Sequence, residues 1–135
     1  MSAGYSGTPL AKKLTLKDGM RVWFDDMPDS ILAEIEEAEI DLHRCPSPDA
    51  DIDAAHIFVT CEASLCSKLA DLRQQIGPTG QIWVSWPKKA SGMETEVDQE
   101  MVRKAGLDAG LVDTKKCAVD ETWSGLKFVI PKKDR

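Results

Sequence analysis

The chain has 135 residues, of which 42% are hydrophobic and 30% are charged, a composition typical of a globular domain rather than of a disordered chain. Its 23 acidic residues outnumber its 17 basic ones and give a formal net charge of −6, which argues against nucleic acids and anionic membrane surfaces as partners. No apolar stretch approaches the ~20 residues that cross a bilayer, and the first residues lack the apolar core of a signal peptide, so we expect a cytoplasmic protein.

The first half of the chain predicts alternating helices and strands. A short helix at 9–14 lies in an N-terminal segment that covers residues 1–16, and the apolar run at 20–24 predicts a buried strand. Residues 28–38 begin with Pro and Asp and carry one apolar stripe, which predicts a helix with a solvated acidic face. A short second strand is predicted at 40–43.

The second half continues the alternation and then ends in two strands with no helix between them. Thr95 to Asp98 resembles a capping box at the start of a helix. The predicted elements are, in chain order, a strand at 55–59, a helix at 62–76, a strand at 81–86, a helix from about 95 to 106 or 110, and strands at 111–119 and 126–130 joined by a tight connection at 120–125.

This order of elements predicts the architecture. Strands that alternate with helices favour a mostly parallel sheet with right-handed crossovers and helices on both faces. We therefore expect one α/β domain over residues 1–135, built as a three-layer Rossmann-like sheet of about six strands with an antiparallel C-terminal hairpin.

Four sequence motifs carry a resemblance to a known family. They are S-G-T-P-L-A-K-K-L at 6–14, K-D-G-M-R-V at 17–22, W-P-K-K-A-S-G at 86–92 and D-E-T-W-S-G-L-K-F at 120–128. In these motifs and in layout the chain resembles an uncharacterised bacterial family catalogued as a domain of unknown function. The resemblance covers nearly the whole chain and implies no settled activity.

The architecture is also similar to that of a class I S-adenosylmethionine-dependent methyltransferase with pieces missing. The resemblance implies a glycine-rich turn after the first strand and an acidic residue at the end of the second, for the cofactor's ribose. This chain has Phe24 to Pro28 at the first position, without a glycine, and only Asp41 or a neighbour for the second. We therefore predict that no cofactor is bound.

Ligands of open α/β sheets bind beyond the carboxyl ends of the parallel strands, where the strand order reverses. Several polar and aromatic residues should reach that rim, and they form the candidate site. They are Asp25, Asp26, Thr60, Glu62, Trp86, Lys88, Lys89, Ser91, Gly92, Asp120, Glu121 and Trp123.

The segment from Lys88 to Gly92 suits an anion, because two ammonium groups, a hydroxyl and backbone amides precede a helix there. The alternative is a pair of solvated lysines that balance Asp120 and Glu121. Asp25 and Asp26 have two possible roles as well, either binding a hard cation or hydroxyl groups, or capping the next helix.

The connection between the last two strands offers acids and an aromatic ring. Asp120 and Glu121 are interpreted either as a general acid and base pair or as turn residues. Trp123, together with Trp86, is predicted either to sandwich a flat ligand or to form a contact point for a partner, whereas Trp83 is expected in the core.

The remaining chemistry-bearing residues favour structural roles. His43 and His56 have no catalytic partner by motif. The four cysteines form no C-x-x-C pair and are predicted to be buried, reduced thiols, with a zinc site from Cys61, Cys66 and His56 as the alternative. No metal is expected.

These observations predict a non-catalytic or weakly catalytic binding domain. Its crevice would take a small anionic ligand or a protein partner, and the chain would be a monomer or a weak homo-oligomer through its hairpin edge. The alternative is a small enzyme of methyltransferase-like descent, in which Asp25, Asp120 or Glu121 acts as a base and Lys88 or Lys89 stabilises an anion.

Overall fold

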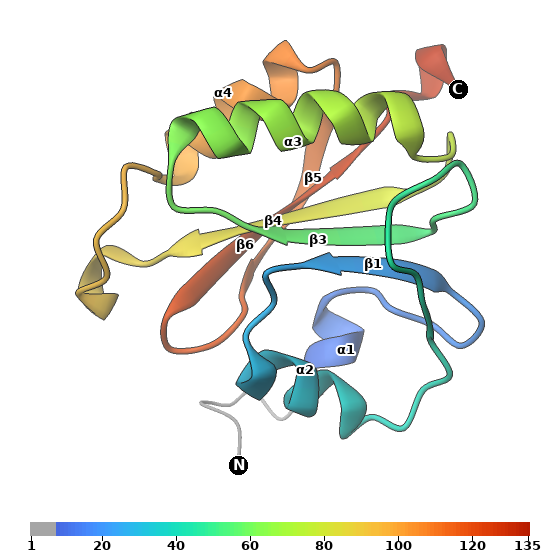
Figure 1. Ribbon diagram of the computed structural model, residues 1–135, viewed down its shortest axis with the longest axis horizontal. Coiled ribbons are helices and arrows are strands. Elements are labelled where there is room, and N and C mark those ends of the chain that lie inside the picture. The colour runs from blue at the N-terminus through green and yellow to red at the C-terminus, as the bar shows by residue number, and fades with distance from the viewer. Residues whose placement is uncertain (1–7) are drawn as a thin grey trace.

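The computed structural model describes residues 8–135 (Figure 1). Within these residues six strands form one sheet, in the order β2-β1-β3-β4-β6-β5. The first four strands in this order are parallel, and β6 is antiparallel to both of its neighbours. The strands are β1 (Arg21–Asp25), β2 (His43–Arg44), β3 (Ala54–Phe58), β4 (Gln81–Pro87), β5 (Val112–Ala118) and β6 (Trp123–Val129). The predicted mixed sheet with a C-terminal hairpin is confirmed.

Helices cover both faces of the sheet. In Figure 1 α1 and α2 lie on one face, and α3 and α4 lie on the other. The α-helices are α1 (Leu10–Lys13), α2 (Asp29–Glu36), α3 (Glu62–Gln75) and α4 (Gln99–Asp108), and two short 3₁₀ helices, η1 (Lys89–Ser91) and η2 (Lys132–Asp134), follow β4 and β6. The sheet is thus the middle of three layers, each face buried against its own pair of helices.

The alternation of side chains along β4 supplies both cores. All seven residues of this strand are buried. Trp83 lies in the core under α1 and α2, and Trp86 lies in the core under α3 and α4, because residues three positions apart on a strand point to opposite faces. Trp83 Nε1 donates a hydrogen bond of 2.9 Å to the carbonyl oxygen of Leu14, which docks the end of α1 on the sheet.

The core under α3 and α4 follows the predicted helical spacing. Leu65, Leu69 and Leu72 of α3 are buried against the sheet, as the sequence predicts. Gly106 of α4 is also buried and packs so closely on Phe128 that a Cβ atom there would overlap the aromatic ring. The absence of a side chain at Gly106 therefore sets how near α4 lies to β6.

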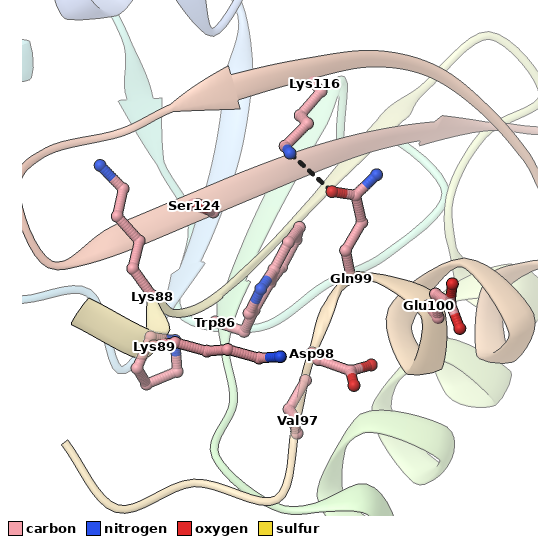
Figure 2. A pocket seen from close by; sticks show the side chains of 10 residues that line it. Trp86, Lys88, Lys89, Val97, Asp98, Gln99, Glu100, Lys116 and Ser124 are labelled. Atoms are coloured by element: carbon pink, nitrogen blue, oxygen red, sulfur yellow. Dashed lines mark hydrogen bonds between the residues drawn. The ribbon is translucent and has the colours of Figure 1, made fainter. Parts of the chain in front are cut away.

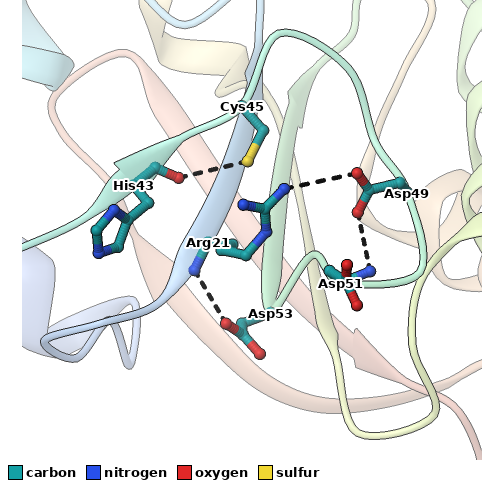
Figure 3. Close-up of polar contacts among 6 residues, drawn as sticks. All are labelled: Arg21, His43, Cys45, Asp49, Asp51 and Asp53. Carbon is teal, nitrogen blue, oxygen red and sulfur yellow. Dashed lines mark hydrogen bonds and ion pairs between the residues drawn. The ribbon is translucent and has the colours of Figure 1, made fainter.

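The connection from β2 to β3 has no helix and is held by polar contacts (Figure 3). The guanidinium group of Arg21 lies 3.6 Å from the Asp49 carboxylate, and the backbone amide of Arg21 donates a hydrogen bond of 2.9 Å to Asp53. The Asp51 amide donates to Asp49 Oδ1 at 2.8 Å. These contacts fix the loop against the beginning of β1.

Three predicted starts of elements lie about three or more residues from those in the structure. The second strand is shorter and lies at 43–44 rather than 40–43. Strand β6 begins at Trp123, so the hairpin connection is only 119–122. The N-cap of α4 is Asp98, whose side chain accepts a hydrogen bond of 2.9 Å from the Met101 amide, and the capping box predicted from Thr95 is wrong.

Over residues 8–135, none of the helices is both long enough and apolar enough to span a membrane.

Candidate functional site

A pocket with a volume of about 480 Å³ lies beyond the carboxyl end of β4, between the β5–β6 hairpin and the first turn of α4 (Figure 2). We call it the Trp86 pocket. Its lining combines an indole ring, three lysines and polar groups of the first turn of α4. The lining residues are Trp86, Pro87, Lys88, Lys89, Val97, Asp98, Gln99, Glu100, Lys116 and Ser124.

The indole of Trp86 lies in the middle of the pocket, with Ser124 opposite it on β6 (Figure 2). Across the pocket, Lys116 Nζ donates a hydrogen bond of 2.6 Å to Gln99 Oε1, which joins the edge strand β5 to α4. The side chain of Lys89 is exposed and extends past Trp86 toward Asp98 in Figure 2. Ammonium groups therefore approach the pocket from two sides.

Lys88 ties the loop after β4 to the hairpin. Its Nζ donates a hydrogen bond of 2.7 Å to the backbone oxygen of Asp120, and its amide donates one of 2.7 Å to the backbone oxygen of Thr122. In Figure 2 its side chain points away from Trp86. Because its side chain points away from Trp86 and its ammonium group bonds to the hairpin backbone, Lys88 positions the pocket wall.

Ser91 and Gly92 shape the same loop and do not line the Trp86 pocket. Ser91 Oγ donates to the Lys88 carbonyl oxygen at 2.7 Å and accepts from the Met93 amide at 3.1 Å. Gly92 has φ of 77° and ends the 3₁₀ turn of η1 in the left-handed region. The structure therefore gives both residues a turn role.

Asp120 is a turn residue. Its Oδ1 accepts hydrogen bonds from the amides of Thr122, at 2.8 Å, and Trp123, at 2.7 Å, and this closes the hairpin connection. Glu121 beside it is exposed. Lys88 contacts the carbonyl group of Asp120 and not its carboxylate, so the predicted charge balance across the crevice is not formed by this pair.

The predicted sandwich of Trp86 and Trp123 is wrong. Trp86 is opposite Ser124 in the β4–β6 register, so the neighbouring Trp123 points to the other face of the sheet. There its ring packs edge-on against Phe58 with centroids 5.0 Å apart. The prediction failed because Trp123 was placed in a loop, whereas the strand already begins there and the side chains alternate.

Asp25 and Asp26 follow β1 as predicted but do not cap α2, which has no side-chain cap. Both carboxylates face Lys68 of α3. Lys68 Nζ forms an ion pair with Asp25 Oδ2 and lies 3.7 Å from Asp26 Oδ2. Asp26 has φ of 59°, a left-handed conformation that Asp tolerates better than most residues.

The loop that precedes α4 is hydrogen-bonded to the rim after β3. Glu96 Oε1 accepts a hydrogen bond of 3.0 Å from the Glu62 amide at the start of α3. The Glu96 amide donates to the Thr60 carbonyl oxygen at 2.9 Å, and Thr95 Oγ1 donates to the same oxygen at 3.2 Å. The chain's own carboxylate therefore occupies the N-terminus of α3.

His56 is structural, as predicted. Its ring is buried, and Nε2 lies 2.7 Å from Ser85 Oγ on the neighbouring strand. Burial lowers its pKa to about 3, because the charged imidazolium loses its hydration there. The ring also stacks on Phe58 with centroids 4.5 Å apart.

The thiols are free, but they are less buried than predicted. Cys117 is buried, which raises the pKa of its thiol, whereas Cys45 and Cys61 are half-buried and Cys66 is exposed on α3. Across residues 8–135, no cluster of three or more His, Cys, Asp or Glu side chains is placed to hold a metal ion.

Sequence reasoning missed Lys68, Gln99 and Lys116. Lys116 lies on the edge strand β5, and Gln99 begins α4, so their meeting depends on tertiary packing. Lys68 is next to the buried Leu69 and three positions after Leu65 on α3, which places it beside the apolar stripe. This spacing is the one feature of the sequence that indicates a position for Lys68 beside the buried face of the helix.

The architecture is that of the methyltransferase-like Rossmann fold. A structure described as "PigF with SAH" matches with a TM-score of 0.62 and 10% identity over 92% of this chain, which spans only 62% of that chain. A S-adenosylmethionine-dependent methyltransferase from Aquifex aeolicus matches with a TM-score of 0.57 and 16% identity, over 90% of this chain and 88% of that one.

A third structure is described as "Complex between the Haloferax volcanii Trm112 methyltransferase activator and the putative methyltransferase". It matches with a TM-score of 0.62 and 11% identity, over 90% of this chain and 86% of that one. At these identities the likeness shows the fold alone.

Residues 11–132 match the family described as "Protein of unknown function (DUF3052)", and the chain belongs to that family. The resemblance found from its motifs is thereby confirmed. No curated protein matches the sequence.

Proposed function

We propose that the chain is a binding domain that takes a small anionic ligand in the Trp86 pocket. The observation that carries this proposal is the placement of Lys89 and Lys116 on two sides of a cavity of about 480 Å³ with an indole ring between them. Ammonium groups attract carboxylates and phosphates, and an indole supplies an apolar surface for the rest of a metabolite.

The first turn of α4 adds to this attraction. Helix N-termini carry a partial positive charge, and Gln99 and Glu100 of that turn line the pocket. Asp98 and Glu100 bring two carboxylates to the same lining, so the pocket is not uniformly positive. This mixture favours a ligand that carries both an anionic group and a donor, rather than a bare inorganic anion.

The test is thermal unfolding of the purified chain against a panel of nucleotides, phosphorylated metabolites and dicarboxylates, because a ligand that prefers the folded state raises the midpoint. The expected result is a rise in midpoint that is reduced in both Lys89→Ala and Lys116→Ala. Lys104→Ala is the matched control, since Lys104 is exposed on α4, pairs with Asp108 and does not line the pocket. An effect that is equal in all three variants would contradict the proposal.

A protein partner is the second candidate. One solved structure of the same fold is a complex with an activator protein, and the outer edge of β5 has no strand beside it among the described residues. A strand of a partner protein would pair with this edge, or a second copy of the chain would pair with it in a weak homo-oligomer. Sedimentation at increasing protein concentration tests self-association, and a constant monomer mass leaves only the heterologous partner.

The enzyme alternative receives less support. Asp25 is paired with Lys68, and Asp120 accepts two amide hydrogen bonds, so neither carboxylate is poised as a base. We place the proposed binding function in the cytoplasm, in keeping with four cysteines that are all free.

A further inference from the structure

The reversal point of the strand order lies between β1 and β3. Strand β1 leads into α2 on one face of the sheet, and β3 leads into α3 on the other, so the chain diverges beyond these two strand ends (Figure 1). In open α/β sheets this divergence creates the crevice in which cofactors and substrates bind. Asp25, the last residue of β1, therefore lies at the floor of this crevice.

A side chain of the protein itself already lies in this crevice. Lys68 Nζ reaches from α3 to the Asp25 and Asp26 carboxylates. The side chains of Lys68 and Asp25 are only 28% and 21% exposed, whereas that of Asp26 is 76% exposed. Asp25 Oδ2 is buried and accepts no hydrogen bond from the described residues, so the ammonium charge alone compensates it there.

The packing of α3 keeps Lys68 in this position. Leu65 and Leu69, on either side of it along the helix, are fully buried in the core. A helix anchored in this way cannot rotate to withdraw the lysine without exposing both leucines. Removing the ammonium group alone would leave the Asp25 charge partly buried and uncompensated, which is costly.

The backbone at the crevice does not suit a nucleoside cofactor. A glycine-rich first turn lets a ligand approach the main chain, but here the turn is Asp25, Asp26, Met27 and Pro28, with side chains in that space. Asp26 takes the left-handed conformation with its Cβ present. The turn therefore has the curvature of a glycine turn without its open surface.

The acceptor for a ribose is at the wrong end of the sheet. Asp41 precedes β2, and its carbonyl oxygen accepts a hydrogen bond of 2.7 Å from the Gly19 amide, in the turn before β1. This is the amino end of the parallel strands, opposite to Asp25. At the carboxyl end β2 finishes with Arg44, a cation that cannot accept a hydrogen bond from a hydroxyl group.

From these three mismatches we infer that the ion pair of Lys68 with Asp25 and Asp26 is the resident occupant of the crevice, and that S-adenosylmethionine does not bind there. The fold is that of the methyltransferases, but the residues present do not fit their cofactor. The inference is independent of the Trp86 pocket, which lies on the other side of β4 from β1.

Two measurements test this inference on the full chain. In calorimetric titration with S-adenosylmethionine and with S-adenosylhomocysteine at millimolar concentrations, we expect no saturable heat. Saturable binding that is lost in Asp25→Asn would overturn the inference. Binding that survives Asp25→Asn but is lost in Lys89→Ala would place the ligand in the Trp86 pocket and would support a closed crevice.

The second measurement reports on Lys68 directly. Lysines are acetylated with a limiting amount of an amine-reactive reagent, and the modified positions are quantified by mass spectrometry. We expect Lys68 to be modified several-fold more slowly than the exposed Lys89, and Asp25→Asn to reduce that difference. Equal acetylation rates at Lys68 and Lys89 in the chain without the Asp25→Asn substitution would show that the crevice is open.

Discussion

The imidazole of His56 on β3 lies with Nε2 2.7 Å from Oγ of Ser85 on the neighbouring parallel strand β4, in the centre of the sheet. This pair is enclosed by Phe58 and Trp83, whose rings contact the imidazole. The histidine is neutral in the folded chain at physiological pH, because its pKa is lowered to about 3 by burial.

The first prediction is a stability that falls with acid because of His56. Below pH 6.5 the unfolded chain binds a proton on this residue and the folded chain does not, until the pH approaches about 3. The free energy of unfolding should therefore decrease by up to about 1.4 kcal/mol per pH unit in this window. Urea unfolding at several pH values between 7.5 and 5 measures it, and His56→Gln should flatten the slope. Parallel slopes in the two proteins would contradict this origin.

The second prediction concerns Gly106. Alanine normally stabilises a helix interior relative to glycine, but a Cβ here would overlap the Phe128 ring. We expect Gly106→Ala to lower the free energy of unfolding by about 1–3 kcal/mol, as overpacking does. Chemical denaturation gives the value, and Phe128→Leu in the same chain should recover part of the loss. A Gly106→Ala variant that is more stable than the original chain would mean that α4 shifts away from β6 without cost.

The third prediction separates backbone strain from charge at Asp26. Asp26→Val and Asp26→Asn both remove the negative charge that faces Lys68, but only valine is strongly disfavoured at φ of 59°. Asp26→Val should cost about 1–2 kcal/mol more than Asp26→Asn. Thermal unfolding of the two variants side by side is the measurement, and equal midpoints would show that the loop relaxes.

The fourth prediction concerns the docking of α1. Trp83→Phe removes the hydrogen bond to the Leu14 carbonyl oxygen, which still accepts one of 2.9 Å from Gln81 Nε2. We expect a loss of about 1–2 kcal/mol and faster hydrogen exchange at the amides of α1. Trp123→Phe is the control, because Trp123 is opposite Pro87, at the other end of β4 from Gln81, which holds the Leu14 carbonyl oxygen, and should leave α1 protected. Unchanged exchange in Trp83→Phe would show that the burial of Leu10 and Leu14 is enough to hold α1 on the sheet.

Much of the fold followed from local patterns, and the limits of prediction have physical causes. The helix predicted at 62–76 is observed at Glu62–Gln75, because its leucines repeat with a helical period and Gly77 follows. The second strand was misplaced because two residues are too few to give a period.

The candidate site was predicted less well, because its contacts join distant segments. The rule for strand ends brought Asp25 and Trp86 to the rim, but it could not reveal Lys68 or Lys116, whose partners are far away in sequence. The error at Trp123 came from a strand that starts three residues earlier than predicted. Since side chains alternate, the corrected strand assigns this residue to the opposite face.

The pairing of β6 with β4 bears on how the chain behaves while it is being made. Strands β1, β3 and β4 are complete once residue 87 has been synthesised, but the partner of β4 on its other side is residues 123–129. Until then β4, whose seven residues are buried in the folded chain and mostly apolar, has an unpaired edge of the kind that recruits other nascent chains. A ribosome that stalls between these two points would therefore release a fragment prone to aggregation, and shortening the chain before Trp123 should have the same effect.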